Sequence, residues 1–387
     1  MERTIRLSLN KFSSVPASLR LNPVIDVSKD EIVVNLGHLY HHYYWDCYCM
    51  DPPDPDPAQF EYLRFLANTK PFLLRGKGLG AHTGARRNRS MELGQAFCRW
   101  FLHEHLGVVY FAHVSEIIER QLSNPFANCS LKRVGEGDAP DYLCAPSVHT
   151  AYLAEAKGRY ESISFANRDF ASWRNQFNRV VFRNARDEAE ALKGFVVATR
   201  FATEDGPNIK STLYAEDPQS PGERSLNEGG MHEIATAVVA THYGRIAERL
   251  GQTILAASLR VGFTVPVEIQ FNAIAWELQM GPLQGTRFIG GYHPPRDGGP
   301  VLESSGGKIH FTRSDPFRLG VGNGTFVGVK ESIFGQMASS ARGQVLDRRT
   351  FDALPPTPAF YSAISLLRDG SIVGPVEFFR PVERVSY

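Results

Sequence analysis

The sequence predicts an α/β protein whose central region, residues 91–203, alternates helices with strands. Two observations support this. Apolar residues recur at helical spacing in residues 91–106 and again over residues 165–191. Short apolar runs of the kind that form buried strands lie between these two segments and after the second one. The predicted order is therefore helix, strand, strand, strand, helix, strand.

Composition limits the class of protein. The chain has 387 residues, 43% of them hydrophobic and 21% charged, which is typical of a globular protein with more than one domain. The formal net charge is +1, so any basic surface must be local. Five scattered cysteines do not form a disulfide framework. We find no signal peptide and no apolar run that could span a bilayer, so we expect a cytoplasmic protein.

Three segments are predicted along the chain. Residues 1–75 form an N-terminal accessory region that favours strands, with one strand at 31–36. Residues 76–203 form the core. Residues 204–387 form an α+β accessory domain for recognition, oligomerisation or partner binding. Its predicted elements are a helix over 231–250, strands at 267–274, 308–312 and 325–329, and a hairpin over 362–379.

A histidine- and aromatic-rich segment, residues 37–49, lies in the N-terminal region. It includes Cys47 and Cys49, which together with the histidines could bind a metal. The spacing matches no known arrangement of zinc ligands. Aromatic packing or an interface is the favoured interpretation, and a zinc site is the alternative.

The segment 75–89 combines four glycines with five cations and has no acidic residue. It lacks the spacing of a Walker loop or a dinucleotide-binding loop. A flexible cationic segment can follow a phosphate backbone, and a solvated loop is the alternative interpretation. The predicted nucleic-acid contacts here are Arg75, Lys77, Arg86, Arg87 and Arg89.

The first core helix is predicted over residues 91–106. Ser90 can cap its start, and Gly107 can end it. Its buried stripe contains Leu93, Ala96, Phe97, Trp100 and Phe101. A strand over 108–114 and a helix over 115–122 follow.

Two strands carry the chemistry of the core. They are predicted over residues 139–144 and 151–158. Side chains alternate along a strand, so Glu155 and Lys157 leave the second strand on the same face. If the two strands are neighbours, Asp141 adds a second carboxylate to this group.

Two adjacent carboxylates repel each other unless a cation lies between them. Oxygen ligands at an open site suit Mg²⁺, which keeps waters and binds substrate phosphate. A bound divalent ion activates water, and a neighbouring lysine can hold that water or neutralise developing charge. The three side chains therefore indicate metal-dependent hydrolysis of a phosphodiester.

The motif Pro140-Asp141, thirteen residues, then Glu155-Ala156-Lys157 resembles the signature of the PD-(D/E)xK nuclease superfamily. The resemblance implies a restriction-endonuclease-like αβββαβ core. It also implies that Asp141, Glu155 and the Ala156 carbonyl hold Mg²⁺, with Mn²⁺ as a substitute, and that Lys157 acts on water.

Two helical residues extend this resemblance. Glu92 matches a glutamate that the first core helix of the family often directs toward the metal, although the helix dipole alone favours a glutamate there. Gln176 matches a glutamine that some branches carry on the second helix. The tyrosine that those branches place four residues later is Val180 here, so the subfamily is not assigned.

The second core helix, predicted over 165–191, is also locally basic. Helical spacing would place Arg179, Arg183 and Arg186 on one face, with Arg159 and Arg174 nearby. We predict that Arg159, Arg174, Arg179 and Arg183 contact nucleic acid. A solvated helix face is the alternative.

Together these features predict a Mg²⁺-dependent endonuclease. The family resemblance favours DNA over RNA as substrate, and the long flanking regions suggest a protein partner or self-association, as in bacterial restriction or antiphage systems. The alternative is a catalytically silent module that keeps the fold and binds nucleic acid or a protein.

Overall fold

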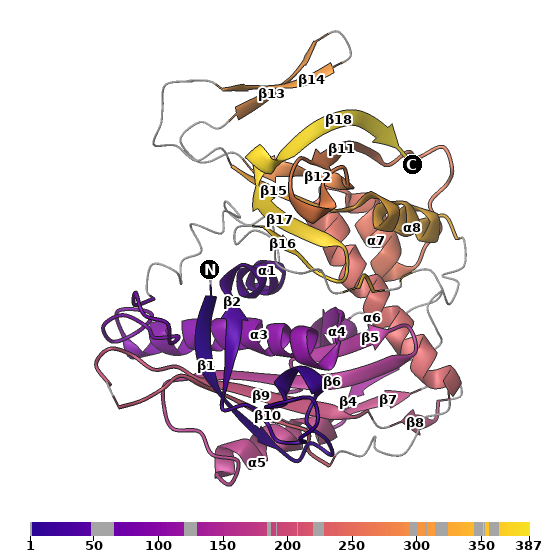
Figure 1. Ribbon diagram of the computed structural model, residues 1–387. Coiled ribbons are helices and arrows are strands. Elements are labelled where there is room, and N and C mark those ends of the chain that lie inside the picture. Colours follow the sequence, from indigo (N-terminus) through magenta and orange to yellow (C-terminus); the bar gives the residue numbers. More distant parts are fainter. Residues whose placement is uncertain are drawn as a thin grey trace. The chain divides into compact units, whose positions relative to one another are not determined.

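The protein divides into two compact units (Figure 1). In this computed structural model the described residues are 2–47, 66–119, 130–183, 187–190, 192–206, 208–219, 228–293, 300–305, 308–313, 324–343, 351, 353–355 and 364–387. The first unit contains the described residues up to His242. The second contains those from Tyr243 onward. The boundary falls within helix α6 (Glu228–Arg249).

A seven-stranded mixed sheet organises the described part of the first unit, in the order β2-β1-β10-β9-β6-β5-β3. Strands β3, β5 and β6 follow one another antiparallel, and β9 then pairs parallel to β6. The protein is therefore a mixed α/β protein, as predicted. The strands are β1 (Glu2–Asn10), β2 (Glu31–Asn35), β3 (Tyr110–His113), β5 (Tyr142–Ser147), β6 (Thr150–Arg159), β9 (Gly194–Arg200) and β10 (Thr212–Glu216).

The sheet continues beyond the predicted core on one side. Strand β10 pairs with β9, β1 pairs parallel with β10, and β2 pairs with β1. Pairing satisfies the backbone groups that the edge of a shorter sheet would expose. The predicted divisions after residues 75 and 203 thus fall inside the first unit and do not match the two compact units.

Helix α3 (Thr83–Leu106) is longer than predicted, because it begins at residue 83 instead of residue 91. The ring of His82 accepts a hydrogen bond from the Ala85 N–H and caps the helix. Ser90 is not a cap; its hydroxyl donates to the carbonyls of Arg87 and Gly158. The end was predicted correctly, since Gly107 adopts φ 70°.

The predicted helix over 165–191 is wrong in its second half. Helix α5 (Arg168–Asn175) passes into a 3-10 turn at Gln176–Arg179 and then into strand β7 (Val180–Arg183). The two valines that open β7 favour a strand, and β7 pairs with β4 (Ser130–Arg133) and β8 (Ala189–Glu190). Arg179 and Arg183 therefore do not share a helical face, and Arg186 lies outside the described residues.

Two further α-helices and one 3-10 turn belong to the described part of this unit. Helix α1 (Leu36–Cys47) contains most of the histidine- and aromatic-rich segment, and it buries Tyr43, Tyr44 and Trp45. The predicted aromatic packing is confirmed for its described residues, while Cys49 lies outside them. The others are α4 (Val114–Glu119) and a 3-10 turn at Ala17–Leu19. None of the helices that can be described has the length and apolar character needed to cross a bilayer.

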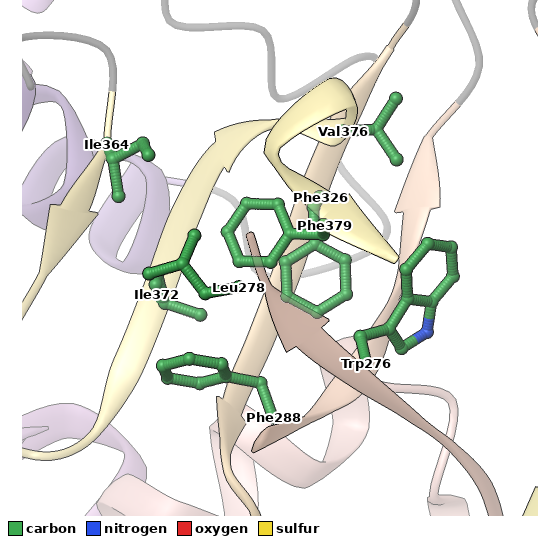
Figure 2. Close-up of a cluster of buried hydrophobic side chains, with 8 residues drawn as sticks. All are labelled: Trp276, Leu278, Phe288, Phe326, Ile364, Ile372, Val376 and Phe379. Carbon is green, nitrogen blue, oxygen red and sulfur yellow. The ribbon is translucent and has the colours of Figure 1, made fainter. Parts of the chain in front are cut away.

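The second unit is built on a six-stranded sheet in the order β16-β17-β15-β12-β11-β18. Its hydrophobic core joins Trp276, Phe288, Phe326, Ile372 and Phe379, which come from different strands (Figure 2). Strand β11 begins five residues later than predicted, whereas the hairpin of β16 and β17 was predicted correctly.

The remaining elements complete the second unit. Its strands are β11 (Asn272–Leu278), β12 (Arg287–His293), β13 (Pro300–Ser305), β14 (Lys308–Arg313), β15 (Thr325–Lys330), β16 (Ser365–Leu366), β17 (Ser371–Pro375) and β18 (Phe379–Ser386). Its helices are α7 (Thr253–Val261), α8 (Glu331–Ala341) and 3-10 turns at Gly281–Leu283 and Val376–Phe378.

Candidate active site

Helix α3 packs very closely against one face of strand β6. The helix and the strand approach each other at Gly94 and Gly158, which have no side chains. A Cβ atom added to Gly158 would lie 1.8 Å from the Ser90 carbonyl oxygen. The Ser90 hydroxyl donates to the carbonyl of Gly158 at 3.1 Å. The residues of β6 that precede Gly158 on this face, Ala154 and Ala156, are also small. The alternation of side chains directs Glu155 and Lys157 to the opposite face.

The structure brings Asp141, Glu155 and Lys157 together. The Lys157 ammonium forms an ion pair with Glu155 Oε1 and lies 3.8 Å from Asp141 Oδ2. Asp141 stands just before β5, where its Oδ2 accepts the Ala156 N–H at 2.8 Å. Its own N–H donates to Glu155 Oε2 at 3.2 Å. These contacts fix the two carboxylates beside each other.

Burial and charge alter the proton affinities of this group. The side chain of Glu155 is fully buried. Burial, and then the charge of Asp141, raise the pKa of Glu155 well above its ordinary value, against the opposing effect of Lys157. Burial alone would lower the pKa of Lys157, but Glu155 and Asp141 outweigh it and raise that pKa. The ionised form of Glu155 therefore depends on a cation next to it.

A cleft of about 930 Å³ lies beside these residues. Lys157, Gly158 and Arg159 line it from β6, and α3 and α5 supply much of the rest. Of the cations predicted in the 75–89 segment, Lys77, Arg86 and Arg87 line the cleft. The cleft is thus lined by Lys157 and several further cations, whereas Asp141 and Glu155 contact Lys157 and are not among the lining residues.

Two other cations of the 75–89 segment are placed differently. Arg75 is exposed and Arg89 half-buried, and neither lines the cleft. The segment is also not the flexible loop considered from the sequence, because its second half forms the first turns of α3. Tyr160 holds its first half by accepting the Leu79 N–H at 2.9 Å.

Gln176 lies in the cleft, in the 3-10 turn that follows α5. Its side chain is buried, and its Oε1 has no hydrogen-bond partner among the described residues. A buried amide oxygen without a partner costs free energy, so this atom is suited to accept a hydrogen bond from a molecule in the cleft.

Glu92 is half-buried on α3, the helix that covers the other face of β6. Within the described residues, no group of three or more His, Cys, Asp or Glu side chains is positioned to hold a metal. The protein oxygens grouped at the site are thus those of Asp141 and Glu155, with the backbone carbonyl of Ala156 between Glu155 and Lys157 in the chain.

The arginines that follow the motif have different environments. Arg159 lines the cleft and donates to Asp169 at 2.6 Å. Arg174 does not line it, because two of its guanidinium nitrogens bind the buried Glu216 at 2.7 Å each. A charge held in this way stabilises β10 against α5. Nothing in its position points to a ligand.

Arg179 and Arg183 also bind the protein itself. The guanidinium of Arg179 donates to the Asp138 carbonyl at 2.9 Å and packs on the backbone of Gly137. Arg179 therefore supports the loop that leads to Asp141. Arg183 lies on β7 and donates to the Asp187 carbonyl. Neither lines the cleft.

A buried polar network next to the site was not anticipated from the sequence. Asp46 of α1 accepts hydrogen bonds from Arg99 of α3 at 3.0 Å and from the Tyr142 hydroxyl at 2.6 Å. His113 lies 3.0 Å from the same carboxylate. Tyr142 directly follows Asp141, so this network holds the start of β5. A lone aspartate within an aromatic run was the available signal.

No protein-family model, curated protein or solved structure matches this chain.

Proposed function

We propose that this protein is a metal-dependent nuclease that hydrolyses phosphodiester bonds. The observation that carries the proposal is the meeting of Asp141, Glu155 and Lys157 beside a cleft lined by further cations. When α4 and the small sheet of β4, β7 and β8 are left out, the order of the remaining elements supports it: a helix, three antiparallel strands, a second helix and a strand parallel to the third. This order and the Pro140-Asp141…Glu155-Ala156-Lys157 motif both resemble the PD-(D/E)xK superfamily.

The residues fit magnesium better than a metal that needs a full protein cage. Mg²⁺ is commonly bound by one or two carboxylates while waters and substrate phosphate complete its coordination. Asp141 and Glu155 provide two carboxylates, and the Ala156 carbonyl is the third oxygen that the resemblance implies. The raised pKa of buried Glu155 points the same way, because a cation would favour its ionised form. Mn²⁺ would substitute.

When bound, the metal ion polarises the phosphodiester and lowers the pKa of a coordinated water. The protein's own residues do the rest. The Lys157 ammonium reaches the carboxylate pair and can orient the attacking water and neutralise charge that develops on the phosphate oxygens. Arg86 and Arg87 attract and position the phosphate backbone. Gln176 offers its Oε1 to a substrate hydrogen-bond donor.

Substitution of Lys157 tests the nuclease. Supercoiled plasmid, linear duplex, single strands and RNA are incubated with the purified protein, with Mg²⁺, Mn²⁺ or chelator. We expect metal-dependent cutting that falls about 100-fold or more in Lys157→Ala, the cost of losing a group that stabilises the transition state. Lys132→Ala is the matched control, because Lys132 is an exposed lysine on β4 outside the cleft. Cutting that survives Lys157→Ala would reject the assignment.

The same experiment separates the second candidate, a silent module that binds nucleic acid or a protein. Two adjacent carboxylates, a lysine and a cationic cleft would also serve binding alone. Retained binding with no cutting of any substrate would favour the module. The complete set of Asp141, Glu155 and Lys157 favours the enzyme.

We further propose DNA as the substrate, with RNA as the other arm of the test, and a cytoplasmic role in a restriction or antiphage system. The region 204–387 would then supply target recognition, self-association or a restraining partner. These steps rest on the family resemblance and on the length of chain outside the core.

A further inference from the structure

The charges that line the cleft are distributed unevenly. The segment leading into α3 and the first turns of that helix contribute Lys77, Arg86 and Arg87. The turn after β6 and the start of α5 contribute Glu161 and Asp169. Helices α3 and α5 lie on opposite sides of the sheet (Figure 1). The cleft therefore has a cationic side and an acidic side.

The acidic side keeps its negative character although Arg159 lies between the two acids. The Arg159 guanidinium donates to Asp169 at 2.6 Å and to Glu161 at 3.4 Å. It also lies 5.8 Å from the centre of the Trp173 ring. One arginine is thus paired with two carboxylates, which leaves a net negative charge. Both carboxylate side chains are well exposed, with exposed fractions of 71% for Glu161 and 53% for Asp169.

Two other acids line the cleft and do not change this distribution. Asp138 raises the pKa of Lys157 together with the carboxylate pair, so we group it with that pair and not with the acidic side. Asp205 is joined through its N–H to the Gly76 carbonyl at 3.3 Å. The negative charge of Asp205 partly offsets the cationic side, but the three positive charges of Lys77, Arg86 and Arg87 exceed it.

Single and double strands respond differently to such a cleft. A single strand has one phosphate backbone, which can follow the cationic side while its bases point away. A duplex has two backbones and twice the charge along its axis. Its second backbone would face Glu161 and Asp169 across the cleft. Like charges at short range oppose binding and thereby determine specificity.

We propose that the cleft selects a single nucleic-acid strand, or an unpaired segment of a duplex, and that Glu161 and Asp169 are the residues that exclude an intact duplex. This inference rests on the proposed nuclease function for its chemistry. The charge distribution that supports it is independent of whether the protein cuts.

Cleavage and binding are measured in parallel. One labelled oligonucleotide sequence is presented as single strand, as blunt duplex and as forked duplex with Mg²⁺. Binding of the same three probes is measured by fluorescence polarisation, using Lys157→Ala in chelator. We expect the single strand and the fork to be cut and bound at least about tenfold better than the blunt duplex.

Removing the acidic side is the decisive comparison. In the double variant Glu161→Gln/Asp169→Asn, we expect the preference for single strand over blunt duplex to fall to about threefold or less. The main change should be faster cutting and tighter binding of the duplex. The control is Glu2→Gln, which removes an exposed carboxylate from β1 away from the cleft. A preference that is unchanged in the double variant would overturn the assigned role of the two acids.

The outcomes separate the two proposals. If the unsubstituted protein cuts and binds the blunt duplex as well as the single strand, or better, the proposed strand selectivity is wrong. The proposed nuclease function is then unaffected. Absence of cutting on every substrate, with single-strand preference retained in binding, removes the nuclease and leaves the strand-selective cleft. Absence of both removes both.

Discussion

At Asp46 a carboxylate is ionised inside the protein because its neighbours compensate for the lost water. Burial would raise the pKa of Asp46, but His113, Arg99 and the hydrogen bonds that it accepts lower that pKa well below the ordinary value. The same carboxylate contacts Tyr142, the residue after Asp141. One buried side chain is thus coupled to the position of a proposed metal ligand.

Replacing Asp46 by asparagine tests this coupling. We expect Asp46→Asn to lower the free energy of unfolding at pH 7 by about 3–5 kcal/mol, since Arg99 would lose the partner of its buried charge. The folded-state pKa is depressed, so the stabilisation is complete above the unfolded value of about 4 and is lost as the pH falls toward the folded value. The variant and the parent should therefore differ less at pH 3 than at pH 7.

Urea denaturation at the two pH values measures this effect. Tyr142→Phe, which removes a single hydrogen bond to Asp46, is expected to cost only about 1 kcal/mol. A difference between Asp46→Asn and the parent that is as large at pH 3 as at pH 7 would contradict the electrostatic explanation.

Among the elements, the contact of α3 with β6 positions the site. The glycines at 94 and 158 allow the helix backbone to lie against the strand, and the chain then presents Glu155 and Lys157 on the far face of β6. In the same way, the early end of α5 allows β7 to form and brings Gln176 into the cleft.

A methyl group at this contact should disrupt it. In Gly158→Ala the new Cβ would lie 1.8 Å from the Ser90 carbonyl oxygen, so α3 must shift. We expect a loss of about 1–3 kcal/mol in stability, the usual cost of overpacking, together with a larger loss of metal-dependent cutting than stability alone explains. Thermal unfolding and cleavage assays measure the two effects.

Gly84→Ala is the matched control. Its Cβ would be at least 3.5 Å from the nearest neighbouring atom, in the first turn of α3. Alanine favours helix, so this variant should be neutral or more stable by up to about 1 kcal/mol. Equal effects of the two substitutions would show that the close contact has no special role.

For the whole molecule, the position of the charged residues is more informative than the net charge. The net charge is only +1, yet Lys77, Arg86 and Arg87 lie together in one cleft. The proposed binding of nucleic acid should therefore use few phosphate contacts, and polyanions should not bind strongly to the rest of the surface.

The salt dependence of binding measures the number of contacts. With three phosphates neutralised on a single strand, the slope of log K against log salt should be about −2. Measured in Lys157→Ala with chelator, the added Arg86→Gln/Arg87→Gln change should reduce the slope to about −0.7, leaving one contact. Lys132→Gln should not change it. If loss of the two arginines left the slope unchanged, the surface that binds phosphate would lie outside this cleft.

Local chemistry along the chain was enough to find the acidic pair and its lysine, because strand alternation places residues 155 and 157 on one face. It also predicted most strands of the core and the end of α3 at Gly107. These features are set by interactions between residues that are close together in the sequence, so they can be predicted without knowing the fold.

Long-range packing decided the rest. It joined β1, β2 and β10 to the core sheet, ended α5 where β7 could pair, and bound Arg174 to Glu216 instead of leaving it at the surface. It also selected which cations line the cleft. Pairing and burial depend on residues far apart in sequence, so their energies become defined only when the chain is folded.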